Sequence, residues 1–544
     1  MLSPENQTKN YSQLFNDIDT GLVKIPQFQR DFVWEKEQTA KLIDSIIKGF
    51  PIGTFIFWKT DEELRTIRDI GNIHLPKTPK GDKAFYVLDG QQRITSLYAV
   101  RKGCRLTRDG KEIDYKDIFI DLDKPFDTDD EVVLTEVDEN TNKISVFELL
   151  NSQVDQLQAN YSHKINEIWR YKEKLSSYNF PVISLNDYPL EIACEVFTRI
   201  NTGGKPLSLF EIMVARTFDE AKKFDLAEKV DELIEGSETE KGLRDVRYET
   251  ISPMIILQAI AAHCCGKIKR QDILRIKKND FIDNWKIVKE GIFHAVNFLR
   301  EDLSIRTSHF LPYDSILVTF SYFFIRNKFQ RPSAAQRKLL QQYIFWVALN
   351  NRFTSGAETK IETDLRRMEK ILKEESPDYR GEEIKLSIEL LEEKTFKTSD
   401  AFSKAILCLL AEFEPRSFET GNRVDLENAA LKRISSKNYH HFFPKAFLEE
   451  NGWDEYWANS VLNITIIEGQ KNISIGKKAP SKYVPQLIKK AKNLNFEEIL
   501  KTHLIDDVEE YGILTDDYDK FLKKRGKKIL TELNKRLPKT EKIS

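Results

Sequence analysis

The feature that most limits the fold of this chain is a long central stretch, residues 240–415, in which apolar residues recur at helical spacing. One such stripe consists of Leu339, Leu340, Tyr343, Ile344, Trp346 and Val347. This spacing predicts consecutive amphipathic helices. On either side of the stretch, short runs rich in aromatic and β-branched residues, such as PIGTFIFWKT, predict strands mixed with helices. We therefore expect an α+β multidomain protein with domains at 1–230, 231–415 and 416–544.

Three segments of the first domain have the composition of an anion-binding site. They are IPQFQRDFVW (25–34), LDGQQRITSLYA (88–99) and VFTRINTGGKPLSLFEI (196–212). In the second segment a strand ends at a turn and a helix follows, so the backbone N–H groups of the helix start and the Arg93 guanidinium can hold a phosphate. The polar side chains available to a nucleotide are Gln29, Arg30, Gln91, Gln92, Asn201 and Lys205. The alternative is that Asp89-Gly90 only begins a helix and Gly203-Gly204 only forms a turn.

Together the three segments resemble the ParB-like N-terminal domain of the GmrSD-type restriction enzymes and related phage-defence proteins, over about residues 10–220. The resemblance implies that this domain binds and hydrolyses a nucleoside triphosphate or senses modified DNA. It assigns nucleotide binding to Gln29, Arg30, Asp89, Gln91, Gln92, Arg93, Asn201 and Lys205. Asp89 would hold Mg²⁺ or orient water. A GxxxxGK[ST] motif is absent from the sequence, so the site would not be a P-loop.

A second group of functional residues lies between Lys437 and Tyr483. His440 and His441 are adjacent there, and downstream of them lie Asn459, Asn463 and Asn472, then Lys477 and Lys478. Histidine suits the role of a general base, and asparagine carbonyls suit Mg²⁺ or Mn²⁺. The alternative is a surface histidine pair followed by turn asparagines.

The order HHFFPKAFL, NSVLNITII and QKNISIGKKAPSKY resembles the ββα-metal (HNH, His-Me finger) nuclease domain of the same family. The resemblance implies that His441 is the general base and that Asn463, or less favourably Asn459, holds its ring. It also makes His440 and Asn472 metal ligands and places Lys478 at the phosphate. His440 stands where many HNH enzymes have an acidic residue, which favours Mn²⁺ or a softer ion over Mg²⁺.

The net charge of −2 does not indicate a nucleic-acid-binding protein, but residues 520–544 contain ten Lys or Arg and only two Glu. This segment is either a phosphate-attracting tail or a solvated basic helix. The N-terminus shows no secretory leader pattern, no long apolar run is present, and the five cysteines are scattered. We therefore expect a cytoplasmic protein that does not enter a membrane.

These patterns predict a metal-dependent DNA endonuclease that acts against phage or foreign, modified DNA. Its expected cofactors are a divalent metal and a nucleoside triphosphate. Its expected partners are double-stranded DNA and a nucleotide, with a homo-oligomer or partner defence proteins as further options. The alternatives are a nucleotide-dependent DNA-binding regulator whose nuclease domain is inactive, and an RNase.

Overall fold

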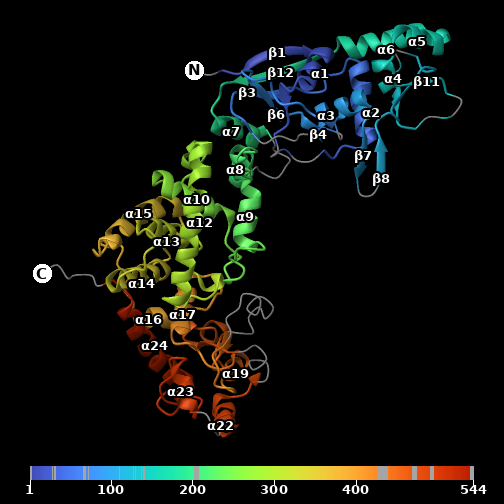
Figure 1. Cartoon of the computed structure of the whole chain (residues 1–544). Coiled ribbons are helices and arrows are strands. Elements are labelled where there is room, and N and C mark those ends of the chain that lie inside the picture. The colour runs from blue at the N-terminus through green and yellow to red at the C-terminus, as the bar shows by residue number, and fades with distance from the viewer. Residues whose placement is uncertain are drawn as a thin grey trace. The chain divides into compact units, whose positions relative to one another are not determined.

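The computed structural model describes residues 3–26, 29, 32–64, 69–70, 73–108, 111–125, 128, 130–136, 138, 141–200, 208–424, 439–467, 475–490 and 495–538. The chain separates into two compact units, Met1–Leu226 and Ala227–Ser544 (Figure 1). The first combines a sheet with helices and the second is mainly helical, so the predicted α+β multidomain class is confirmed. The helical middle and the C-terminal segment, predicted with a boundary at 415, lie in one compact unit.

A five-stranded mixed sheet forms the centre of the first unit. Its strand order is β1 (Glu5–Asn10), β12 (Asn179–Asn186), β3 (Phe55–Thr60), β6 (Ala84–Asp89) and β2 (Val23–Lys24). The β12–β3 and β2–β6 pairs are parallel and the other two pairs are antiparallel. Since alternate residues of a strand share a face, Phe55 and Phe57 lie on one side of β3, and both are fully buried.

Several helices of the first unit belong to the same hydrophobic core as this face of the sheet, and four of them contribute most of its helical residues. They are α1 (Tyr11–Asp19), α2 (Lys36–Ile47), α3 (Gln91–Lys102) and α6 (Ile165–Ser177). The helix α7 (Leu190–Ile200) lies beside β6, and α8 (Leu209–Thr217) follows. The smaller elements are β4 (Asp69–Ile70), β5 (Ile73–His74), β7 (Arg105–Arg108), β8 (Lys111–Asp114), β9 (Phe119–Asp121), β10 (Val133–Leu134), β11 (Lys143–Ser145), α4 (Val146–Asn151), α5 (Val154–Asn160) and η1 (Ser162–Lys164).

The helix α13 (Ile316–Arg326) is central to the helical part of the second unit. Every residue from Ile316 to Phe324 is buried, as expected for a helix that is apolar on all sides. It packs against α10 (Pro253–Cys265), α12 (Lys278–Glu301) and α15 (Ala357–Leu372). The remaining helices here are α9 (Leu226–Glu235), α11 (Arg270–Arg275), η2 (Ser308–Phe310), α14 (Ala334–Leu349), η3 (Arg352–Thr354), α16 (Ile388–Glu392) and α17 (Ala401–Glu412).

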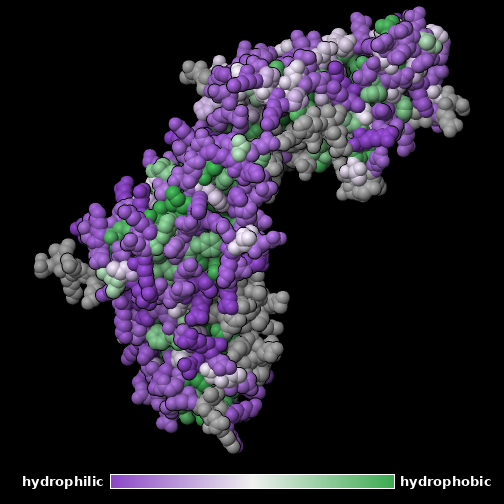
Figure 2. Space-filling model, in the orientation of Figure 1, coloured by the Kyte–Doolittle hydropathy of each residue, from purple (hydrophilic) through white to green (hydrophobic). Residues whose placement is uncertain are grey.

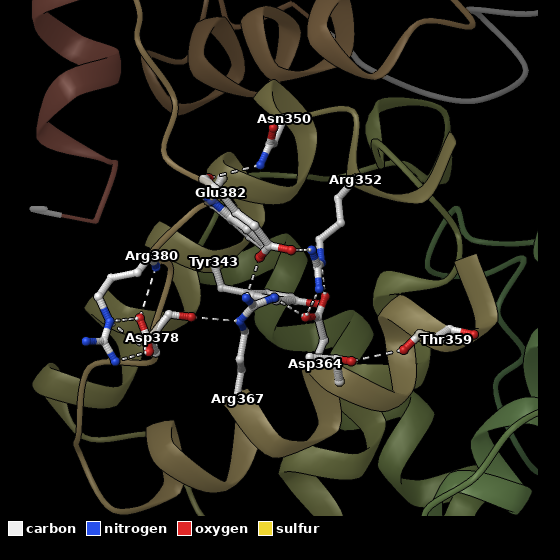
Figure 3. Close-up of polar contacts among 11 residues, drawn as sticks. Tyr343, Asn350, Arg352, Thr359, Asp364, Arg367, Asp378, Arg380 and Glu382 are labelled. Atoms are coloured by element: carbon white, nitrogen blue, oxygen red, sulfur yellow. Dashed lines mark hydrogen bonds and ion pairs between the residues drawn. The ribbon is translucent and has the colours of Figure 1, made fainter. Parts of the chain in front are cut away.

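A buried ion network joins α14, α15 and the segment that precedes α16 (Figure 3). The fully buried Asp364 carboxylate accepts bonds from Arg352 Nε and Nη2, at 2.7 and 2.8 Å, and from Arg367. Glu382 accepts bonds from the same two guanidiniums. Both guanidiniums also lie over the Trp346 ring, 4.6 Å from its centroid. Two positive and two negative groups therefore balance within this network.

The C-terminal part of the second unit contains a two-stranded hairpin surrounded by helices. The hairpin strands are β13 (Tyr439–His441) and β14 (Ile464–Ile466), which pair in antiparallel register. The helices are α19 (Lys445–Glu450), α20 (Glu455–Ala458), η4 (Val461–Asn463), α22 (Pro480–Lys490), α23 (Phe496–Lys501) and α24 (Tyr518–Lys535). The Arg525 guanidinium of α24 is buried and donates to the Leu462 carbonyl at 2.6 Å, which ties α24 to the hairpin.

The molecular face in Figure 2 is mostly hydrophilic, with hydrophobic residues in small groups. Among the helices that the structure describes, none combines the length and apolar character needed to span a bilayer.

Candidate functional site

The hairpin places His440 and His441 on opposite sides of β13. His441 pairs with Ile464 and His440 with Thr465, so their side chains alternate across the strand. The His440 side chain is only 1% exposed and lies among the rings of Phe418, Phe442 and Tyr483. The His441 side chain is partly exposed. The two histidines therefore face different surroundings.

Asn459 determines which nitrogen of His441 carries the proton. The Asn459 side-chain amide donates to the Phe396 carbonyl at 3.0 Å, and a carbonyl can only accept. The Asn459 Oδ1 oxygen therefore faces His441 Nε2, at 2.9 Å, and that nitrogen must be the donor. The neutral ring then keeps its lone pair on Nδ1.

Burial favours this neutral form of His441. It lowers the pKa of the His441 imidazole, and the positive charge of Lys445 lowers it further, while the hydrogen bond to Asn459 acts in the opposite direction. A histidine that is neutral near pH 7 can accept a proton from water.

Asn463 does not contact the His441 ring, so the prediction that Asn463 holds this ring is wrong. Its side chain is fully buried and bonds to backbone instead: Nδ2 donates to the Phe443 and Ala458 carbonyls, at 2.9 and 3.1 Å, and Oδ1 accepts from Phe443 N–H at 2.8 Å. Because Asn463 ends the η4 turn, its amide reaches the loop after β13. Asn463 therefore fixes the course of the chain that follows His441, and Asn459 holds the ring.

Of the two predicted metal ligands, His440 and Asn472, the structure describes only His440. No group of three or more His, Cys, Asp or Glu in the described ranges is arranged to hold a metal ion. His440 faces aromatic rings and not the side of His441, because neighbouring strand residues point in opposite directions. Asn472 lies outside the described residues, and Lys478 is exposed.

The first two N-terminal segments are adjacent in the structure. The buried Gln29 side chain donates to the Val87 and Leu88 carbonyls of β6, at 2.9 and 3.2 Å. The Val33 N–H donates to Gln92 Oε1 at 2.9 Å. The helix α7, which begins the third segment, lies beside β6. Arg30, Asn201 and Lys205 lie outside the described residues.

The Arg93 guanidinium binds groups of its own domain. It donates to the Thr54 carbonyl and to the Asp89 carboxylate, both at 3.1 Å, and to the Ile52 carbonyl. Gly90, with φ of +90°, makes the tight turn before α3, and a Cβ at this position would lie 2.3 Å from the Phe55 ring. These contacts match the structural alternative for the turn, and phosphate binding by Arg93 stays a prediction.

The basic C-terminal segment is largely a packed helix. In α24, Lys524 pairs with Glu510 at 3.3 Å and Lys528 with Asp506 at 3.0 Å. Arg525 is buried, and burial lowers the pKa of its guanidinium to about 10. Glu510 and Asp506 thus offset the charge of two of the lysines that the sequence shows here.

Two features of the site were not predicted from the sequence. The first is the Phe396 backbone, which lies 63 positions from Asn459 and has no sequence motif. The second is His503, which is fully buried behind the hairpin and bonds through Nδ1 to Thr465 Oγ1 and through Nε2 to the Arg416 carbonyl. The NSVLN motif contains two asparagines, Asn459 and Asn463, and the sequence leaves both as candidates for the residue that holds the His441 ring. The directions of their side chains in the structure show that Asn459 bonds to the ring.

Comparison with known proteins gives two similarities. Residues 11–218 match the family described as GmrSD restriction endonuclease, N-terminal domain. The chain is also 26% identical to an uncharacterized protein of Methanocaldococcus jannaschii, MJ0686, over 97% of this chain and 98% of that protein. The first unit is thus similar to the N-terminal domain of a restriction endonuclease family, which confirms that part of the resemblance.

Proposed function

We propose that this protein is a defence endonuclease that cuts DNA with its C-terminal hairpin site and responds to a nucleotide or modified DNA through its N-terminal unit. The similarity of residues 11–218 to the GmrSD restriction endonuclease N-terminal domain supports the class of function. The observation that carries the cutting activity is the bond from His441 Nε2–H to Asn459, which leaves Nδ1 as the base.

In this proposal His441 Nδ1 accepts a proton from the water that attacks the phosphorus atom. Asn459 stabilises the imidazolium that forms, because its carbonyl oxygen accepts the Nε2–H bond throughout. Asn463 keeps the loop after β13 in place. Lys478 is exposed near the start of α22 and would contact the phosphate. A divalent metal, with Asn472 as a ligand, is part of the proposal and would stabilise charge on the phosphate.

For the N-terminal unit we propose a nucleoside triphosphate site at the junction of β6 and α3. The support is that the first two polar segments meet there through Gln29 and Gln92, and that α7, whose last residues belong to the third segment, lies beside β6. The first N–H groups of α3 favour an anion. Asn201 and Lys205 remain proposed contacts.

The test is a cleavage assay on plain and modified plasmid DNA and on total RNA, with Mg²⁺, Mn²⁺ or Ni²⁺, with and without nucleotide. We expect cleavage of DNA that needs metal. His441→Ala should reduce the rate by about 10²–10⁴-fold, the usual contribution of a general base. His163→Ala, which removes an exposed histidine of the first unit, serves as the control.

Cleavage of RNA alone would assign an RNase. Nucleotide-dependent DNA binding without cleavage would assign a regulator. A His441→Ala variant that cuts at the rate of the unmodified protein would contradict the assignment of the base.

A further inference from the structure

The helix α22 presents a face of lysines beside the hairpin. Residues 475–490 contain five lysines and no acidic residue. On α22 itself, Lys482, Lys489 and Lys490 are exposed, and none of them forms an ion pair with a described residue. Lys482 and Lys489 are seven positions apart, so they lie on the same side of the helix, about 10 Å apart along its axis.

The opposite side of α22 attaches it to the loop that follows His441. Pro480, Tyr483, Val484 and Leu487 are buried at helical spacing. The Tyr483 hydroxyl donates to the Phe442 carbonyl at 2.6 Å, and Phe442 is the residue next to His441. The position of the lysine face is therefore set by the same loop that carries the proposed base.

Two acidic groups bond to residues at, or just before, the N-terminal end of α22. Asp516 accepts bonds from Ser481 N–H and Oγ, at 2.8 and 2.6 Å. Glu450 pairs with Lys477 at 2.8 Å. Lys482, Lys489 and Lys490 take part in neither contact, so the charge of this face is not offset as the charge of α24 is.

We propose that the exposed face of α22 is a docking surface for the phosphate backbone of duplex DNA, centred on Lys482, Lys489 and Lys490. Charge complementarity carries the proposal, because a row of lysines on a helix without acidic residues suits a row of phosphates. The choice of DNA rests on the proposed function. The surface holds the duplex so that its backbone passes the hairpin.

The test measures binding of a fluorescent DNA duplex by anisotropy, at several salt concentrations and without divalent metal. All proteins carry His441→Ala, so that no cutting occurs. The test variant adds Lys482→Gln, Lys489→Gln and Lys490→Gln. The control adds Lys520→Gln, Lys524→Gln and Lys528→Gln on α24, which removes the same charge from lysines beside acidic residues. Melting temperatures verify that both variants fold.

We expect the α22 variant to bind the duplex roughly tenfold or more weakly, and the slope of log affinity against log salt to fall by about 3, one for each phosphate contact. The α24 control should keep the parent's affinity and slope. Unchanged binding by the α22 variant, or equal losses in both variants, would overturn the proposal. The proposal would also be overturned if the α22 variant bound an RNA hairpin more weakly than the parent protein does but bound the DNA duplex equally well.

This outcome is separate from that of the proposed function. A protein that binds DNA through α22 but whose cleavage does not depend on His441 would retain the docking surface and lose the proposed base. A protein that cuts through His441 but binds DNA normally after the α22 changes would retain the base and lose the docking surface.

Discussion

At the scale of single residues, Asn459 decides how the site can work, because it sets the tautomer of His441. Replacing Asn459 with Ala removes the acceptor at Nε2 and frees the ring to rotate. We expect kcat for DNA cleavage to fall roughly 10- to 100-fold, a smaller loss than removal of the base, with little change in KM. Single-turnover and steady-state cleavage rates test this.

The conservative change Asn459→Asp keeps an acceptor for His441 and loses the donor to the Phe396 carbonyl. This variant should keep more activity than the alanine variant. Asn451→Ala, at an exposed asparagine of the same unit, is the control. Equal rates for Asn459→Ala and the unmodified protein would remove Asn459 from the site.

His503 leads to a prediction about stability and pH. Burial lowers its pKa to about 3, and the positive charge of Arg525 and the neighbouring His440 act in the same direction. The Arg416 carbonyl accepts from Nε2, and Thr465 donates to Nδ1, so the neutral ring satisfies both partners.

Between about pH 6.5 and about pH 3 the unfolded chain therefore binds a proton at this histidine that the folded chain does not. The free energy of unfolding should fall as the pH falls, by up to about 1.4 kcal/mol per pH unit from this residue. His503→Gln should flatten that slope in urea unfolding, and His163→Gln should not. Parallel slopes for His503→Gln and the unmodified protein would contradict the assignment.

The sequence predicted which residues belong to the candidate site better than it predicted their hydrogen-bond partners. His441 was identified by HHFFP, and the structure gives it the burial and the bonds that a base needs. Asn459 and Asn463 lie four positions apart in one motif, so spacing alone did not separate them. The η4 turn between them directs Asn463 to the backbone and Asn459 to His441, and this turn depends on contacts with Phe396 far away in the chain.

At the scale of elements, periodic segments were predicted well and their packing was not. The helix predicted to follow the turn in LDGQQRITSLYA is α3, which begins at Gln91, directly after Gly90 with its positive φ. The segment near residues 380–400 is highly charged, a composition that is typical of a surface connection. In the structure, Glu382 enters the arginine network, and the backbone of Lys394 and Phe396 bonds to the hairpin region. Charge density in the sequence does not reveal partners that lie distant in the chain.

The arginine network yields a prediction at this scale. Asp364→Asn leaves Arg352 and Arg367 buried with one carboxylate between them (Figure 3). Loss of one partner from a buried ion pair typically costs about 3–5 kcal/mol, so the free energy of unfolding of the second unit should fall by that amount. Asp378→Asn breaks the exposed pair with Arg380 and should leave the unfolding midpoint nearly unchanged. Equal shifts for the two variants would contradict a structural role of the network.

At the scale of the whole molecule, the two compact units each have a core and each carry one proposed site. Units with their own cores generally unfold separately, so calorimetry should show two transitions. Asp364→Asn should lower one of them. Arg93→Ala should lower the other transition, because it reduces the free energy of unfolding of the first unit by about 1–3 kcal/mol. The variant leaves the Asp89 carboxylate and two backbone carbonyls without their donor.

A nucleoside triphosphate that binds the first unit should raise the transition that Arg93→Ala lowers, because a ligand stabilises only the unit that it binds. At a concentration 100 times its Kd the gain is about 2.7 kcal/mol. The other transition, identified by Asp364→Asn, should not move. If the nucleotide raises the unfolding temperature of the second unit, or of neither unit, the nucleotide site is not in the first unit. If the nucleotide raises the unfolding temperature of the first unit and also changes the cleavage rate, the nucleotide-bound state of the first unit alters the activity of the hairpin site, because the two sites are on different units.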